Sequence, residues 1–157
     1  MANNYTRLSD TITAHEGTAF ITIDGENREL FEISSLRAEL EMEIQERRML
    51  GHKMTQHKVT GVSGSGSATL YFMNSNQLNN AVNFLKNGTN SNINLQVKNY
   101  DPQSTVGEQE VVLSNVIFST IPVTVLEESD EPITFSSSFT FDDIKILKSF
   151  DLPDNYR

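Results

Sequence analysis

The stretch LRAELEMEIQERRMLGHKMTQHKVTGVSGSGSATL, residues 36–70, decides the fold. In its first ten residues, apolar and polar side chains alternate, which places them on opposite faces of an extended strand. On a helix the same apolar residues would scatter around the circumference, so burial favours the strand. The apolar set is Leu36, Ala38, Leu40, Met42 and Ile44, and the polar set is Arg37, Glu39, Glu41, Glu43 and Gln45. The sequence therefore predicts a strand that packs its apolar face on its own domain and carries a row of carboxylates on the other.

The rest of this stretch predicts a basic loop at about 46–58 and then a second long strand. The loop combines cationic side chains with methionines, and the following strand ends in the β-prone run Ala68-Thr69-Leu70-Tyr71-Phe72. Gly61, Gly64 and Gly66 interrupt it, which indicates a bulge or a close approach of another chain segment.

Outward from this hairpin, most segments repeat the period of a strand. Asp24-Gly25 is a turn pair, so 19–23 and 29–33, which includes Phe31, are expected to form a hairpin. Further strands are predicted at 93–97, at 111–125 with Pro122 near its end, and at 133–141, where Ser137 interrupts the apolar residues. A turn is expected at 100–107.

One segment, 76–87, has the spacing of an amphipathic helix. Leu78, Ala81, Val82 and Leu85 fall at i, i+3, i+4 and i+7, as one buried stripe would require. Ser75 can cap its start, and Gly88 can end it. Because a lone helix of about three turns is marginal in water, we expect it to cover the sheets.

These elements predict a mainly β fold, a β-sandwich or barrel of antiparallel strands with one packed α-helix. The 157 residues suffice for a single domain over 1–157, with short flexible segments at 1–10 and 151–157. The net charge of −9 opposes general binding to nucleic acid or to an anionic membrane. The chain has no cysteine, and the sequence shows neither a secretion signal nor a membrane span, so we expect a soluble protein made in the cytoplasm.

Signals for chemistry are weaker than their structural alternatives. His52 and His57 have no obvious third ligand, and His15 stands alone, so we predict no metal site. The glycine-rich 61–66 lacks the Lys-Ser/Thr pair and the helix of a phosphate loop. Asp142 and Asp143 are expected to be solvated, as is the Glu row. Because no nucleophile, base and orienting group can be assigned together, we expect neither an enzyme nor a cofactor.

The order of several motifs resembles the tail tube protein family of contractile bacteriophage tails and related prophage particles. The resemblance spans about 12–153 and is strongest at 47–71. It rests on Glu16-Gly17, Ile23-Asp24-Gly25, RRMLGHK at 47–53, GSGSATLY at 64–71, PITF at 132–135, FTFDD at 139–143 and Pro153. It departs from the family's pattern in the Asn-rich 74–99 and in the acidic 127–131.

The resemblance implies a structural virion protein whose hexameric rings stack into a hollow inner tube within a contractile sheath. DNA would pass through the tube without sequence-specific binding. The implied partners are other copies of this chain and the sheath, baseplate or initiator and tape-measure proteins, and the implied location is the tail of the virion.

Two groups of residues are candidates for roles in such a tube. A carboxylate row and a hydroxyl row could line a water-filled lumen: Glu39, Glu41, Glu43, Thr134, Ser136 and Ser138. The basic loop, alternatively a mobile solvated loop, suits a contact between stacked rings: Arg47, Arg48, Met49, Leu50, His52, Lys53, Met54 and Lys58. A different class of function remains open, a free-standing β-sandwich that binds carbohydrate or peptide at a tail tip or in a secretion apparatus, although Trp is absent.

Overall fold

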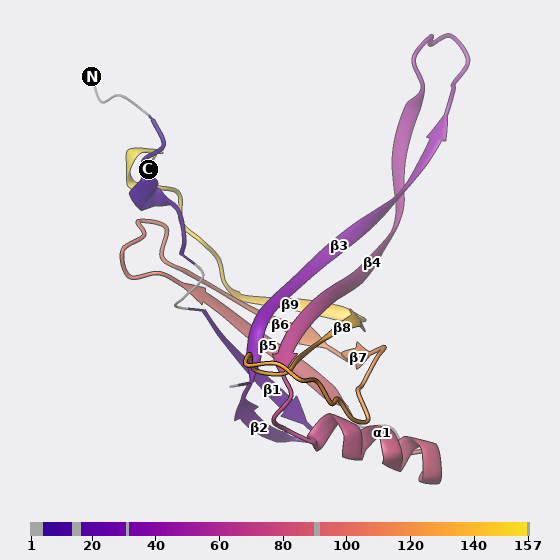
Figure 1. Ribbon diagram of the computed structural model, residues 1–157. Helices are drawn as coiled ribbons and strands as arrows, with labels where there is room; N and C mark the ends of the chain where they lie inside the picture. Colours follow the sequence, from indigo (N-terminus) through magenta and orange to yellow (C-terminus); the bar gives the residue numbers. More distant parts are fainter. Residues whose placement is uncertain (1–4, 14–16, 31, 90–91, 157) are drawn as a thin grey trace.

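The computed structural model describes residues 5–13, 17–30, 32–89 and 92–156, and it is built from two antiparallel β-sheets and one α-helix (Figure 1). The first sheet has the order β2-β1-β5-β6-β9, and the second has the order β3-β4-β8-β7. The predicted fold class, mainly β with antiparallel strands and one helix, is therefore confirmed; the sheets form an open sandwich rather than a barrel. The predictions that involve Phe31, His15 and Glu16 lie outside the described residues.

The bounds of the elements are as follows. The first sheet contains β1 (Thr18–Ile23), β2 (Glu26–Glu29), β5 (Ile93–Tyr100), β6 (Glu108–Ser114) and β9 (Asp143–Lys148). The second contains β3 (Ile33–Arg47), β4 (Gln56–Tyr71), β7 (Ile117–Phe118) and β8 (Thr134–Phe141). The α-helix α1 is Asn76–Asn87, and short 3-10 turns lie at Leu8–Asp10 and Asp154–Tyr156. In the described part of the chain, no helix is long and apolar enough to cross a membrane.

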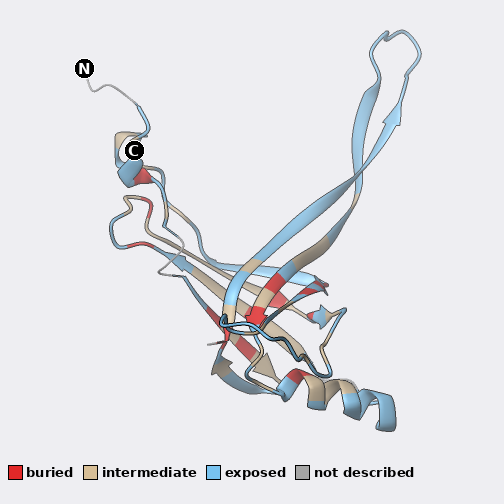
Figure 2. Cartoon of the chain, viewed as in Figure 1, coloured by how far each residue is buried: buried red, intermediate tan, exposed pale blue. Residues whose placement is uncertain are grey.

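The hydrophobic core lies where the two sheets face one another, at the base of β3 and β4. Ile21 and Leu95 from the first sheet pack in one cluster with Leu70 and Phe139 from the second, and each is at most 2% exposed. Figure 2 shows the buried residues gathered in this body, whereas the outer part of the β3–β4 hairpin is exposed. Burial is thus concentrated at one end of the hairpin.

The β3–β4 hairpin confirms the two strands expected from 36–70, but it is longer than predicted. Pairing continues out to Arg47 and Gln56, so the connecting loop is only 48–55 rather than 46–58. The predicted bulge is present, because the register shifts beside Gly61, between Glu43 and Ile44. The outer part of the ladder is a two-stranded ribbon, and from residue 44 to residue 59 every residue is exposed.

Gly64 and Gly66 permit the close approach that the sequence predicted. A Cβ atom on Gly64 would lie 2.4 Å from the Phe141 ring, and one on Gly66 would lie 2.4 Å from the Phe139 ring. The two rings therefore lie directly over the backbone of β4. This packing requires hydrogen in place of a side chain at both positions.

Helix α1 has the predicted bounds, and its predicted end is confirmed, since Gly88 adopts a left-handed φ of 69°. Its start differs from the prediction: the Ser75 side chain makes no capping bond, and Asn74 Oδ1 instead accepts from the Asn76 backbone N–H at 2.9 Å. The predicted buried stripe is also only partly correct. Leu78 is half-buried, whereas Leu85 is 81% exposed. The helix contacts the body through its first turns and then extends away from it (Figure 1).

Three strand predictions need correction. The second strand of the first hairpin is Glu26–Glu29, directly after the turn, rather than 29–33. The expected long strand at 111–125 is two strands, β6 and β7, because Asn115 has a positive φ of 53° and the chain crosses there to the other sheet. The strand β9 was not predicted, although Ile144 and Ile146 alternate with charged neighbours.

Two buried carboxylates join the N-terminal segment to the turn between β5 and β6. Asp10 accepts from the Thr105 hydroxyl at 2.6 Å, and Asp101 accepts from the Thr13 backbone N–H at 2.9 Å. The C-terminal segment lies against the same region, since Asn155 donates to the Tyr5 carbonyl at 2.9 Å. Hydrogen bonding to the charged form lowers the pKa of both Asp10 and Asp101 below their usual value.

Candidate functional site: a polar sheet face and a basic hairpin tip

The second sheet has one exposed polar face that contains every predicted lumen residue. Glu39 pairs with Ser65, which pairs in turn with Thr140, so these side chains point to the same side. The same parity holds along both strands and places six residues on this face: Glu39, Glu41, Glu43, Thr134, Ser136 and Ser138. Residues from two separate parts of the sequence therefore form one surface.

This face is built from short hydroxyl side chains beside the carboxylate row. Between the two candidate rows, β4 contributes small residues, Ser63, Ser65, Ser67 and Thr69, and the Thr69 and Ser136 hydroxyls lie 3.2 Å apart. Arg37 is the cation at the base of the carboxylate row, opposite Ser67. This surface is therefore polar and largely exposed, and it is acidic along β3.

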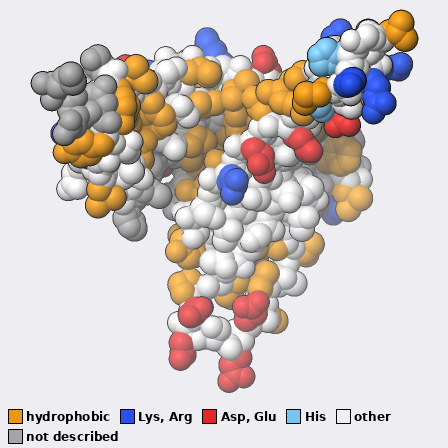
Figure 3. All heavy atoms as spheres, turned by 90° about the horizontal axis from the view of Figure 1, so that it is seen from above, with side chains coloured by type: hydrophobic (Ala, Val, Ile, Leu, Met, Phe, Trp, Pro, Cys, Tyr) orange, Lys and Arg blue, Asp and Glu red, His pale blue; other side chains and the backbone are white. Residues whose placement is uncertain are grey.

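The opposite face of the hairpin is apolar and exposed, which corrects the expectation that it packs on its own domain. Leu36 is half-buried, but Leu40, Met42 and Ile44 are 45%, 49% and 58% exposed. Their partners across the ladder, Val59 and Val62, are exposed as well. The strand β3 extends beyond the two-sheet body, so only its first apolar residues pack against the core. Figure 3 shows hydrophobic side chains along the hairpin toward its tip.

An open cleft continues this apolar surface into the body. It lies between the hairpin and the first sheet and is lined by residues including Leu40, Val111, Leu113, Phe141 and Ile144. The edge strand β9 adds Ile146, which lies on the same side of the strand as Ile144 and is also exposed. The sequence analysis missed this part of the surface because it did not assign β9, although the alternation of Ile144 and Ile146 could have revealed it.

In the described part of the chain, four strands lie at sheet edges, β2 and β9 in the first sheet and β3 and β7 in the second, and the edge strands β3 and β9 border the apolar cleft. There β3 pairs with β4 alone, and β9 pairs with β6 alone. Their outer backbone N–H and C=O groups can pair with a strand of another chain. The ion pairs of Glu108 with Lys98, at 3.0 Å, and with Lys148 hold β9 against its sheet.

The predicted ring-stacking residues gather at the far end of the hairpin, which we call the tip and define as 47–58. Figure 3 shows Lys, Arg and His side chains together at this end. Arg47 ends β3, whereas Lys58 lies within β4. Every residue of the tip is exposed, including Met49, Leu50 and Met54.

The two histidines of the tip have separate local contacts. The His57 ring lies 3.4 Å from the Glu46 carboxylate across the ladder, and the His52 ring lies 3.3 Å from the Met54 carbonyl. Among the described residues, no group of His, Cys, Asp and Glu has the arrangement of a metal site.

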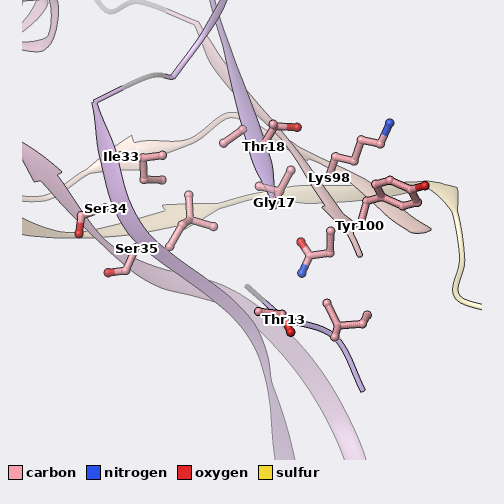
Figure 4. A pocket seen from close by; sticks show the side chains of 13 residues that line it. Thr13, Gly17, Thr18, Ile33, Ser34, Ser35, Lys98 and Tyr100 are labelled. Atoms are coloured by element: carbon pink, nitrogen blue, oxygen red, sulfur yellow. The ribbon is translucent and has the colours of Figure 1, made fainter. Parts of the chain in front are cut away.

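A shallow pocket lies between β1, β3 and β5 (Figure 4). Thr13, Thr18, Ser34 and Ser35 contribute hydroxyl groups to its lining, and Lys98 contributes an amine that is paired with Glu108. The described lining residues include no carboxylate or histidine that could serve as a base for these hydroxyls. The polar face and the hairpin tip are therefore the stronger candidates for function.

Comparison with known proteins gives consistent results over nearly the whole chain. The family model described as "Phage tail tube protein" matches residues 4–148. The "Phage-like element PBSX protein XkdM" of Bacillus subtilis (strain 168) is 31% identical over 148 residues, which cover 94% of each chain. The "Uncharacterized protein YqbM" of the same organism is 30% identical over 151 residues, which cover 96% of each.

Solved structures share the fold at low sequence identity. A chain of the anti-feeding prophage baseplate has a TM-score of 0.66 and 14% identity, with 87% of this chain and 95% of that chain covered. A chain of the sheath–tube complex of an extracellular contractile injection system, in the extended state, has a TM-score of 0.60 and 10% identity, with 90% and 95% covered.

Proposed function

Because this chain belongs to the phage tail tube protein family, we propose that its copies form hexameric rings that stack into the hollow inner tube of a contractile tail. The observation that carries the proposal is the polar face of the second sheet, where Glu39, Glu41 and Glu43 lie with Thr134, Ser136 and Ser138. A sheet with one hydrated face and one apolar face suits the wall of a water-filled tube. The extended apolar hairpin then requires neighbouring copies to cover it.

Ring formation in this proposal uses the open edges and the uncovered apolar surfaces. The exposed side chains of Leu40, Met42 and Ile44 lose contact with water when a neighbour covers them, which favours association by about 25 cal/mol per Å² of buried apolar area. The open edge of β3 can continue the second sheet into the next copy. The lumen wall would then be one sheet shared by the ring.

An acidic lumen would let DNA pass without holding it. Duplex DNA carries about one negative charge per 1.7 Å of its axis, and a basic wall would bind it by releasing counterions. A carboxylate-lined wall repels the duplex instead, and at physiological salt this repulsion extends only about 8 Å. That range keeps DNA off the wall and does not bar its entry.

The hairpin tip is proposed to contact the adjacent ring. Its methionines can adapt to a partner surface, and Arg47 and Arg48 can each donate paired hydrogen bonds to a carboxylate. We propose the tail of the virion as the location and the sheath, baseplate or initiator and tape-measure proteins as further partners. The similar solved structures are chains of a baseplate and of a sheath–tube complex, which supports these partners.

Negative-stain electron microscopy of the purified, concentrated protein tests the proposal. We expect six-fold rings, and stacks of rings with a stain-filled channel. Particles that remain monodisperse monomers at every concentration, and that bind glycans on an array, would contradict it and favour a carbohydrate-binding β-sandwich instead. A variant with Leu40 and Met42 changed to Asn is the matched control, since it keeps the polar face and should lose ring formation.

A further inference from the structure

The tip and an acidic segment lie at opposite ends of the second sheet. In the ladder between β4 and β8, Gly64 pairs with Phe141 and Tyr71 pairs with Thr134. The tip lies beyond the Gly64 end of this ladder, toward Gln56. The segment 119–133, which we call the acidic segment, leads into Thr134 and therefore approaches the sheet from the Tyr71 end.

The tip and the acidic segment cannot meet within one chain. Within β4 (Gln56–Tyr71), Lys58 is the tip residue nearest to Tyr71, and the 71 − 58 = 13 steps between them, at about 3.3 Å each, separate the tip from the Thr134 end by about 43 Å. The acidic segment is anchored at both ends, since Ser119 N–H donates to the Ser138 carbonyl and Phe72 N–H donates to the Ile133 carbonyl, each at 2.8 Å. Any contact between tip and segment must join two molecules.

The two surfaces match in charge and in apolar content. The tip has four cationic side chains, Arg47, Arg48, Lys53 and Lys58, with the exposed apolar residues Met49, Leu50 and Met54. The acidic segment has four carboxylates, Glu127, Glu128, Asp130 and Glu131, with the exposed apolar residues Val123 and Leu126. Each surface can therefore offer both ion pairs and apolar contact to the other.

Other carboxylates are less suitable as partners of the tip. Glu108 is paired with Lys98 and Lys148, and Asp142 accepts a hydrogen bond from the Asn115 side chain. Glu39, Glu41 and Glu43 belong to the same hairpin as the tip. Unlike these groups, the acidic segment combines exposed acidic side chains, exposed apolar side chains and a position at the opposite end of the sheet.

We infer that the hairpin tip of one copy docks on the acidic segment of a copy in the next ring. This contact is head-to-tail, so it does not close on itself and repeats from ring to ring, as a tube requires. The inference rests on the proposed stacking of rings and names the surface that receives the tip. The contact would recur once per subunit at each ring boundary, so a weak single contact becomes a strong joint.

A charge exchange tests the inference. One variant carries Arg47→Glu and Arg48→Glu, a second carries Glu127→Lys and Glu128→Lys, and a third carries all four changes. We expect each double variant to raise the critical concentration for tubes by at least about tenfold, since the repeated joint loses its ion pairs. The critical concentration of the variant with all four substitutions should be within about threefold of that of the original protein, because opposite charges again face one another.

The matched control combines Arg47→Glu and Arg48→Glu with Glu26→Lys and Glu29→Lys on β2, and it should not restore tubes. Circular dichroism of each variant checks that the monomer folds. Suppose that the original protein forms tubes but the variant with all four substitutions has a critical concentration as high as that of the double variants. This result would contradict the inference and leave the proposed function intact. Original protein that forms neither rings nor tubes would contradict the proposed function and the inference together.

Discussion

At the scale of single residues, the packing of Phe141 and Phe139 requires glycine at Gly64 and Gly66. A residue with a Cβ atom there would displace the ring of Phe141 or Phe139. Gly61 lies in the same strand but differs in its surroundings, since a Cβ atom there would meet only the carboxylate and side chain of Glu43. The exposed Glu43 side chain can rotate into water, whereas a closely packed aromatic ring cannot move without displacing its neighbours.

We therefore predict that Gly64→Ala destabilises the subunit by about 1–3 kcal/mol through overpacking. Gly61→Ala is the matched control and should change the free energy of unfolding by less than about 0.5 kcal/mol, as is usual for exposed sites. Urea unfolding of the two variants, followed by circular dichroism, measures the difference. Equal midpoints for both variants would show that the Phe141 ring does not restrict this position.

The carboxylates of Asp10 and Asp101 give the N-terminal segment a dependence on pH. Asp101 accepts from the backbone N–H groups of Thr13 and Gln103, and the Thr105 hydroxyl is the strongest partner of Asp10, which also lies 3.8 Å from the Arg7 guanidinium. Because these bonds lower the pKa of both groups in the folded state, the unfolded state binds more protons as the pH falls. The stabilisation is present at neutral pH and is lost in acid.

We expect the amides of the 5–13 segment to exchange hydrogen faster as the pH falls below about 4, after correction for intrinsic exchange rates. The variant Asp101→Asn should show fast exchange of Thr13 already at neutral pH and a weaker response to acid. Asp130→Asn, in the exposed acidic segment, is the control and should behave as the original protein. An exchange rate that does not change in acid would show that the Asp10 and Asp101 carboxylates do not hold the 5–13 segment in place.

At the scale of elements, the hairpin tip can be separated from the strands that carry it. Arg47 pairs with Gln56, so the ladder is complete without the connecting residues 48–55. Replacing 48–55 with Asn-Gly gives the two-residue turn that such a ladder favours. We predict that the shortened subunit keeps its stability within about 0.5 kcal/mol, because every replaced residue is exposed.

The same replacement should abolish long tubes while leaving single rings. Electron microscopy of the shortened and the original proteins at equal concentration provides the measurement. A variant in which 48–55 keeps its length but is replaced by Gly and Ser distinguishes the loss of the side chains from the loss of reach. Tubes of normal length from the shortened protein would show that the tip has another role.

The elements also show where sequence patterns succeed and where they fail. The alternation of 36–45 and the helical spacing of 76–87 are local, so they predicted β3 and α1 correctly. Which side chains become buried depends on how far the rest of the molecule extends, and Ile44 and Leu85 lie beyond it. The division between β6 and β7 follows from the left-handed backbone of Asn115, and the Ser114-Asn115 pair within 111–118 was the local signal for it.

At the scale of the whole molecule, the polar face joins parts of the chain that are far apart in the sequence. Its two candidate rows could be proposed from alternation in each strand, but only the pairing of β4 with both β3 and β8 brings them onto one face. The cleft beside β9 could not be predicted without that strand. An exposed apolar face has the same alternation as a buried one, which is why the sequence pattern assigned the hairpin's apolar face to its own domain.

The lumen hypothesis predicts a specific effect of charge on transport. Glu41→Lys together with Glu43→Lys should leave tubes assembled, because both side chains are exposed on the polar face, but should slow the passage of DNA by attracting its phosphates. Ejection kinetics of particles built with the variant measure this effect. The neutral pair Glu41→Gln and Glu43→Gln should give an intermediate rate, and equal rates for all three proteins would exclude an electrostatic role for these residues.

The pairing of β4 with β8 also has a consequence for how each subunit is made. The two strands of the hairpin are neighbours in sequence, so the hairpin can form early. In contrast, Tyr71 can pair with Thr134 only after that residue has been synthesised, and β6 can pair with β9 only after synthesis has reached Lys148. Contacts of such long range slow folding. A chain still attached to the ribosome would thus expose the apolar face of its hairpin before the rest of the subunit has folded, and this exposure favours premature contacts between nascent chains.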